Sequence, residues 1–214
     1  MLRKSVEDSV LNRAKECLAK LAPQILGALQ GPASQEKFDQ LVEITGTPLP
    51  EGFLRLYGEH NGTDPNQVVN FFYGYTFLGL DECIRQSADY ANIENSTALK
   101  NADSGIKTNY VFGACRVPIG DDKGTSLICV DLDPAPGGTF GQVILLDYDS
   151  NVALALADSI EKFIEDFSND LANGRYTLNQ EALEAGEHWL ETDAEIDLSN
   201  WYGTQRWAYA KNWI

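Results

Sequence analysis

Residues that carry out catalysis are scarce in this sequence. The 214 residues include two histidines, and no GxSxG nucleophile turn, GxGxxG turn, GK[ST] phosphate loop or HExxH helix occurs. His60 belongs to an EHNG segment at an expected helix end, where the helix dipole alone favours histidine. His188 lies between Glu187 and Trp189, away from any nucleophile motif of the kind that acid–base catalysis needs. The sequence therefore predicts a protein that is not an enzyme and needs no cofactor.

Cysteine is also sparse, and its spacing is uninformative for metal binding. The four cysteines form no CxxC pair, and each has apolar neighbours: Cys17, Cys83, Cys115 and Cys129. A free cysteine in such surroundings behaves as a small hydrophobic residue. We expect four reduced thiols in the core, with no disulfide and no metal site.

Long apolar runs are absent. No stretch approaches the roughly 18 apolar residues that a membrane helix requires. The first 20 residues, MLRKSVEDSVLNRAKECLAK, carry charges throughout and lack the apolar region of a secretory signal. These features predict a soluble, cytoplasmic chain that does not bind membranes.

Basic residues are half as frequent as acidic ones. The chain has 16 Lys and Arg against 32 Asp and Glu, for a net charge of −16. Residues 181–200 contain seven carboxylates and no Lys or Arg. Such a surface repels nucleic acid and anionic lipid and attracts basic proteins. The excess charge has a second interpretation, which is solubility alone.

Hydrophobic periodicity predicts a single α+β domain. Apolar residues recur at helical spacing in residues 6–21, 38–42, 53–57, 81–90 and 160–171, with Asp158 as the expected cap of the last helix. β-branched runs predict strands over residues 68–78, 110–112, 116–119, 126–131 and 142–147, whereas residues 94–108 are polar and read as a surface loop. The short links between the central strands favour antiparallel pairing. Helices, then strands, then a closing helix indicate the α+β class.

The last 42 residues differ in character from the rest. All four tryptophans lie in residues 173–214, together with the acidic cluster: Trp189, Trp201, Trp207 and Trp213. Aromatic residues dominate both buried cores and binding hot spots. The tryptophans therefore either dock this segment onto the sheet or provide anchors for a partner.

Three segments together resemble the SUKH superfamily, which is named in part after yeast regulators of cell-wall synthesis. They are the leucine–proline helix ending in Asn61-Gly62, the strand–turn–strand RVPIGDDKGTSLICVDLD (116–133), and GQVILLDYD (141–149) followed by LADSIEKFIEDF (156–167). Their order and spacing carry the resemblance over residues 34–171. It implies a mostly antiparallel or mixed central sheet, flanked by N-terminal helices and a closing C-terminal helix. We expect one domain over residues 1–172, with the extension 173–214 packed on it.

The resemblance also implies a function without catalysis. Bacterial members are mostly immunity proteins against toxins of competition systems, and the compact chain lacks the long arms of fungal regulators. We therefore expect a tight one-to-one complex with a cognate toxin, whose active site is occluded. The alternative is a housekeeping regulator or adaptor that binds a cellular enzyme or scaffold. The predicted partner-binding residues combine tail acids and aromatics: Glu184, Glu187, Trp189, Glu191, Asp193, Glu195, Asp197, Trp201 and Tyr202.

One set of aspartates leaves a catalytic or metal-binding alternative open. Six carboxylates follow or precede the central strands: Asp121, Asp122, Asp131, Asp133, Asp147 and Asp149. If they converged, they could bind Mg²⁺ or Ca²⁺ or form the acid pair of a glycosidase. Aspartate is, however, a common turn residue, and each of the six lies beside a turn.

Overall fold

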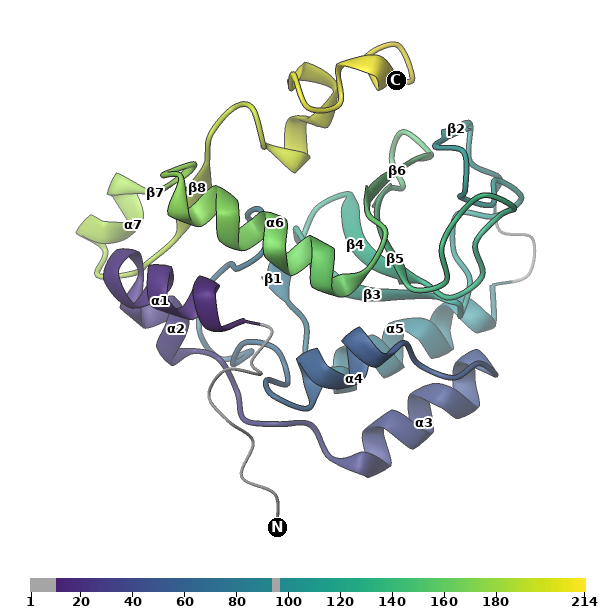
Figure 1. Cartoon of the computed structure of the whole chain (residues 1–214), viewed down its shortest axis with the longest axis horizontal. Helices are drawn as coiled ribbons and strands as arrows, with labels where there is room; N and C mark the ends of the chain where they lie inside the picture. Colours follow the sequence, from purple (N-terminus) through teal and green to yellow (C-terminus); the bar gives the residue numbers. More distant parts are fainter. Residues whose placement is uncertain (1–10, 94–96) are drawn as a thin grey trace.

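A computed structural model describes residues 11–93 and 97–214 of the chain (Figure 1). Four helices come first, and the main strands and a long helix follow. The helical elements are α1 (Asn12–Leu21), α2 (Pro23–Gly27), α3 (Gln35–Thr45), α4 (Glu51–Tyr57), α5 (Leu80–Ala91), α6 (Ile160–Ala172), α7 (Gln180–Glu184) and the 3-10 helices η2 (Leu198–Gly203) and η3 (Ala208–Ala210). The strands are β1 (Thr76–Phe77), β2 (Asn101–Ala102), β3 (Arg116–Asp121), β4 (Ser126–Asp131), β5 (Gln142–Asp147), β6 (Val152–Ala157), β7 (Tyr176–Leu178) and β8 (Leu190–Thr192).

Six strands form one mixed sheet in the order β1-β3-β4-β5-β6-β2, and β7 and β8 form a small second sheet. All neighbours in the large sheet are antiparallel except β2, which runs parallel to β6. The pairing of β4 with β5 is regular from Ser126 opposite Asp147 to Asp131 opposite Gln142. The predicted α+β class with a mixed sheet is confirmed.

Alternate residues of the central strands enter two separate cores, because successive side chains of a strand point to opposite faces. On β4, Ile128 and Val130 belong to the main core with the helices, whereas Leu127 and Cys129 face a smaller core. The segment that includes Leu99, Ile106 and Val111 covers this smaller core. Both faces of the sheet are thus buried.

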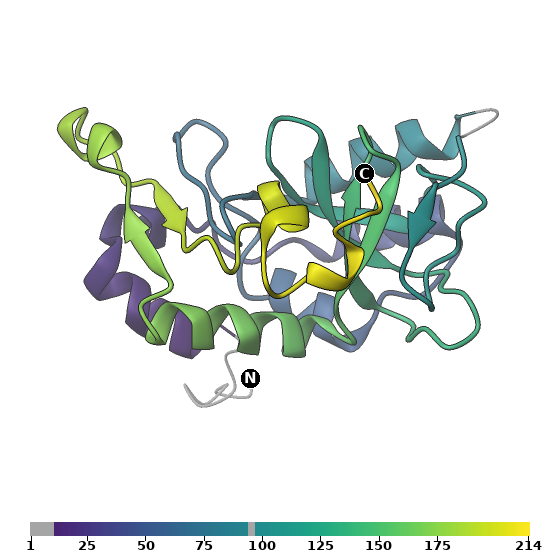
Figure 2. The same cartoon turned by 90° about the horizontal axis from the view of Figure 1, so that it is seen from above.

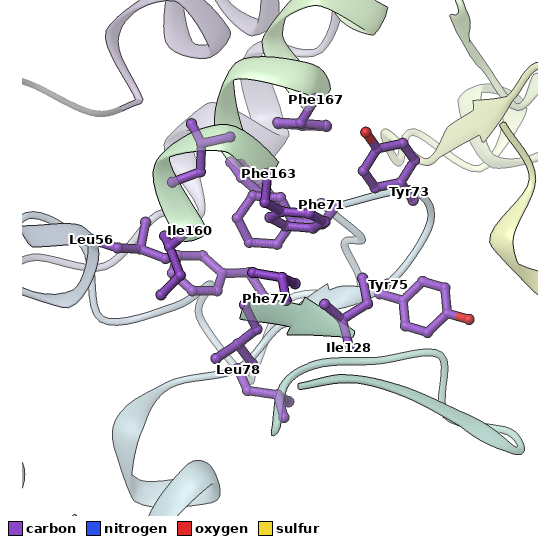
Figure 3. Close-up of a cluster of buried hydrophobic side chains, with 14 of the residues drawn as sticks. Leu56, Phe71, Tyr73, Tyr75, Phe77, Leu78, Ile128, Ile160, Phe163 and Phe167 are labelled. Carbon is purple, nitrogen blue, oxygen red and sulfur yellow. The ribbon is translucent and has the colours of Figure 1, made fainter. Parts of the chain in front are cut away.

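An aromatic cluster connects α6 to the segment that leads into β1 (Figure 3). Phe163 and Phe167 of α6 lie 5.1 and 5.2 Å, between ring centroids, from Phe72, and Phe72 contacts Phe77 of β1 at 5.1 Å. These side chains are almost completely buried. The stripe predicted on the closing helix therefore packs α6 against the segment before β1, and Phe72 connects it to the edge strand of the sheet.

Several element boundaries differ from the sequence-based prediction. The cap of α6 is Ser159 and not Asp158, because the Ser159 hydroxyl accepts the Lys162 backbone N–H. Only residues 76–77 of the predicted strand 68–78 form a strand of the sheet, and residues 110–112 form no strand. Strand β6 was not predicted because its sequence, VALALA, suits a helix as readily as a strand. Val6 and Val10 of the first predicted helix, and residues 94–96 of the predicted loop, lie outside the described residues. Within the described ranges, no helix is long and apolar enough to cross a membrane.

Two buried titratable side chains, Tyr57 of α4 and Cys83 of α5, are in contact in the core. The Tyr57 hydroxyl donates to the Leu78 carbonyl at 2.9 Å, and the Cys83 sulfur lies 3.3 Å from the same hydroxyl oxygen. Burial raises the pKa of the Cys83 thiol to about 12 and also raises the pKa of Tyr57. Both groups are therefore neutral in the folded chain at physiological pH.

These pKa values predict a loss of stability in alkali. In the unfolded chain, the pKa of cysteine is about 8.5 and that of tyrosine about 10. The folded chain therefore binds more protons above pH 9. We expect the free energy of unfolding to be unaffected by these groups below pH 8 and to fall between pH 9 and 12, by about 1.4 kcal/mol per pH unit for each retained proton. Urea unfolding at each pH measures this fall.

The variant Cys83→Ala should reduce the slope of that fall, because it removes a buried group that keeps its proton in the folded chain. A free energy of unfolding that stays constant from pH 8 to 11 would contradict the assignment of Cys83 and Tyr57 as buried neutral groups.

Candidate protein-interaction face

The acidic tail is held on the domain by a buried tryptophan. Only 1% of Trp201 is exposed, and its side chain belongs to the main core. Its indole Nε1 donates to Asp147 Oδ2 at 3.0 Å, at the end of β5. Trp207 is also buried in this core. Of the two interpretations of the tail tryptophans, docking onto the domain describes these two residues.

An ion pair fixes the tail a second time. Both terminal nitrogens of Arg206 donate to the Asp170 carboxylate of α6 at 3.0 Å, and the Tyr73 hydroxyl donates to the same group at 3.2 Å. The Asp170 side chain is 10% exposed. Farther along, the Asn101 side chain of β2 donates to the Trp213 carbonyl. The tail thus crosses the molecule from β8 to the β2–β6 edge of the large sheet (Figure 2).

Strands β7 and β8 form an arm that positions Trp189. They pair from Tyr176 opposite Thr192 to Leu178 opposite Leu190, and α7 lies at the outer end of the arm (Figure 2). The buried side chain of Asn70 makes hydrogen bonds of 2.9 and 2.8 Å to the backbone N–H and carbonyl of Leu190. These two hydrogen bonds to the backbone fix the base of the arm, and with it the half-buried Trp189.

Tail acids and a turn of the large sheet line a common groove of about 490 Å³, which we call the acidic groove. Four carboxylates face it, against one cation, Arg175: Asp122, Glu191, Asp193 and Asp197. Trp189 lines the groove as well. The backbone N–H of Glu195 and the Arg175 guanidinium lower the pKa of Asp193, so this group keeps its charge at mildly acidic pH.

The buried Tyr75 hydroxyl shows how closely the carboxylates of different elements approach. It lies 2.6 Å from the Ser126 hydroxyl, which donates to Asp122 at 2.6 Å. Burial raises the pKa of Tyr75, and the charges of Asp122, Asp147 and Asp197 raise it further. Acids from the β3–β4 turn, the end of β5 and the tail thus act together at one end of the sheet.

The six strand-end aspartates, for which the sequence left a metal-binding or catalytic alternative open, are not brought together in one site. Asp121 lies opposite Leu127 and Asp131 opposite Arg116, so the two occupy opposite ends of the β3–β4 pair. Asp131 is buried and accepts hydrogen bonds from Gln142 and the backbone of Asp133. Among residues 11–93 and 97–214, no group of three or more His, Cys, Asp or Glu is placed to hold a metal ion. Asp121 and Asp131 therefore cannot form the acid pair of a glycosidase.

The predicted partner-binding residues fall into three groups. Trp189, Glu191, Asp193 and Asp197 line the acidic groove. Glu184 and Glu187 are exposed near the outer end of the arm, Glu195 pairs with Arg175 at 2.8 Å, and Tyr202 is partly exposed. Trp201 is buried and positions the tail. Asp122 belongs to the groove but was predicted only as a strand-end acid, because nothing in the sequence indicates that the tail lies beside that turn.

The sequence is similar to a protein family and to proteins of two yeasts. A family model, SMI1 / KNR4 family (SUKH-1), matches residues 32–166. The cell wall biosynthesis/cell cycle regulator smi1 of Schizosaccharomyces pombe is 25% identical over 179 residues, which cover 75% of this chain and 33% of that protein. The cell wall assembly regulator SMI1 of Saccharomyces cerevisiae is 18% identical over 213 residues, which cover 81% of this chain and 41% of that protein. The chain therefore spans about a third to two fifths of the length of these relatives.

The ion pair that fixes the tail can be tested by removing its cation. Arg206→Ala leaves the shielded Asp170 carboxylate with only the Tyr73 hydroxyl, so we expect a loss of about 2–3 kcal/mol in the free energy of unfolding. The control, Arg85→Ala, removes an arginine that pairs with Glu82 and Asp89 on the exposed face of α5 and should cost about 1 kcal/mol or less. Equal losses in the two variants, measured by urea unfolding, would contradict a tail held by Asp170.

Proposed function

The chain belongs to the SMI1/KNR4 (SUKH-1) family, and from this premise we propose that it acts without catalysis, by binding a basic protein through the acidic groove. The observation that carries the proposal is the collection of four carboxylates around Trp189, from the tail and the β3–β4 turn. An acidic concave surface attracts a basic partner over several ångströms and accelerates their encounter. Tryptophan is one of the residue types enriched among the side chains that carry most of the binding energy of a complex.

The partner that we propose is a cognate toxin of a bacterial competition system. The family includes immunity proteins. An immunity protein blocks a toxin inside the cell that produces the immunity protein. In this proposal the chain works in the cytoplasm and forms a one-to-one complex, in which the acidic groove covers the active site of the toxin. The tail 173–214 then forms part of the binding face and packs on the domain of residues 1–172. Glu184, Glu187 and Tyr202 would lie at the periphery of the contact.

A second function, a regulator or adaptor for a cellular enzyme or scaffold, is favoured by a different observation. The two relatives described above are named as regulators of cell-wall biosynthesis or assembly. Both candidate functions use a protein partner, and the genomic context of the gene separates them. A toxin gene directly upstream supports immunity, whereas an isolated gene supports regulation.

Co-expression tests the immunity proposal directly. We expect the product of the adjacent gene, induced alone, to arrest growth of the host cells, and co-expression of this chain to restore growth. Growth arrest that the chain does not relieve would contradict immunity.

The contribution of the groove to binding can be measured by charge reversal. The double variant Glu191→Lys/Asp193→Lys changes the groove, and Glu184→Lys/Glu187→Lys makes the same change of net charge near the outer end of the arm. At low salt we expect the first variant to lower the association rate constant with the adjacent gene product about tenfold or more, and the control to lower it much less. The difference should shrink in high salt, because ions screen the field. Identical rates for the two variants would remove the acidic groove from the contact.

A further inference from the structure

A second groove, which we call the apolar groove, lies on the other side of Trp189. Its volume is about 450 Å³, and Trp189 is the residue that it shares with the acidic groove. Six of its sixteen lining residues have large apolar side chains: Pro65, Val68, Val69, Phe77, Leu78 and Trp189. Lys123 lines the apolar groove and the preceding residue, Asp122, lines the acidic groove, so the two grooves meet at the β3–β4 turn as well.

The wall of the apolar groove is held in place by the backbone. Thr63 N–H donates to the Phe77 carbonyl at 2.9 Å, and Asp64 N–H donates to the Ala28 carbonyl at 2.8 Å. Gly62 has a φ of +75°, and a Cβ at this position would lie 2.4 Å from the Gly79 nitrogen. Only glycine allows these two segments to approach so closely. The groove is thus formed before any partner binds, which reduces the entropic cost of binding.

Val68 of this wall is 62% exposed. It stands beside a floor of buried residues, Val69, Phe77 and Leu78. Concave sites lined by apolar side chains with a few polar groups at the edge are the usual form of binding pockets. An apolar side chain placed between Val68 and Trp189 would remove the surfaces of both from water.

The rim of the apolar groove carries three carboxylates, Asp64, Asp81 and Glu82, and one cation, Lys123. Outside the lining, Lys37 pairs with Asp81 and Arg85 pairs with Glu82, which leaves Asp64 as the carboxylate without an ion pair among the described residues. The backbone N–H of Asn66 and the side chain of Gln67 donate to Asp64 and lower its pKa, so this carboxylate is ionised at neutral pH. Basic residues on either side of an inserted apolar side chain would therefore meet negative charge in both grooves.

We propose that the apolar groove receives one leucine-sized or aromatic side chain from a partner segment whose flanking residues are Lys or Arg, with the basic flank continuing past Trp189 into the acidic groove. The charges of the two rims and the apolar floor between them carry this proposal. It rests on the proposed function, because it names the kind of segment that the basic partner presents.

Short peptides test this proposal with the full chain. The probe is the peptide Gly-Lys-Lys-Leu-Lys-Lys-Gly, and its control has Ser in place of Leu. Binding is followed through backbone amide and tryptophan indole resonances of the isotope-labelled protein. We expect the leucine peptide to shift the amides of residues 64–69 and 76–82 and the Trp189 indole. The serine peptide should bind at least about tenfold more weakly, because it loses the burial of the leucine side chain.

Two protein variants complete the test. Val68→Ser removes the apolar lip without changing the charge, and Val42→Ser removes a valine of 37% exposure from α3, on a different element. We expect weaker binding of the leucine peptide to the first variant and unchanged binding to the second. Equal binding of both peptides, or shifts confined to the acidic groove, would overturn the apolar anchor and leave the proposed function intact. Growth that the chain fails to restore in the co-expression experiment would remove the proposed function itself.

Discussion

The burial of Trp201 determines where the acidic tail lies. Its indole occupies the main core and donates to Asp147 at the end of β5, so the preceding residues, including Asp193 and Asp197, must pass the same end of the sheet. The Arg206–Asp170 ion pair and the hydrogen bonds of Asn70 to Leu190 fix the segment on either side. Without these contacts, nothing would hold the carboxylates of the tail beside Asp122 on one surface. The candidate interaction face is therefore a consequence of how the tail packs.

The regular part of the fold could be predicted from local sequence patterns. Strands β4 and β5 occupy the predicted residues 126–131 and 142–147, because β-branched runs bounded by turn residues are a strong local signal. The sequence of β6, by contrast, has no bias toward β-branched residues, and only its pairing with β5 makes it a strand. The helix cap at Ser159 differs by one residue from the prediction, because neighbouring Asp and Ser are both good caps.

The candidate site could be predicted only in part, since it depends on contacts between distant residues. The run of acids between residues 181 and 200 and the nearby tryptophans are visible in the sequence. Their separation into groove-lining and buried members is not, because Trp189 and Trp201 are equally aromatic and differ only in their place in the fold. The apolar groove has no signal in the sequence, since Val68 lies in a run that reads as a buried strand.

In the proposed complex, the charge of the acidic groove and the apolar surface of the second groove have different roles. Charge acts at a distance and controls the rate of encounter, whereas desolvated apolar contacts mainly control how long a complex lasts. Trp189 lines both grooves and therefore joins the two effects in one contact. The family is shared by proteins of different roles, so in the proposed function the character of this surface, and not the fold, would select the partner.

The most direct test of this account is hydrogen–deuterium exchange of the chain, free and in complex with the product of the adjacent gene. Slower exchange in the complex at residues 64–69 and 189–197, on both sides of Trp189, is the result that the account predicts. Slower exchange confined to other surfaces, such as the segment 97–112 over the smaller core, would contradict it.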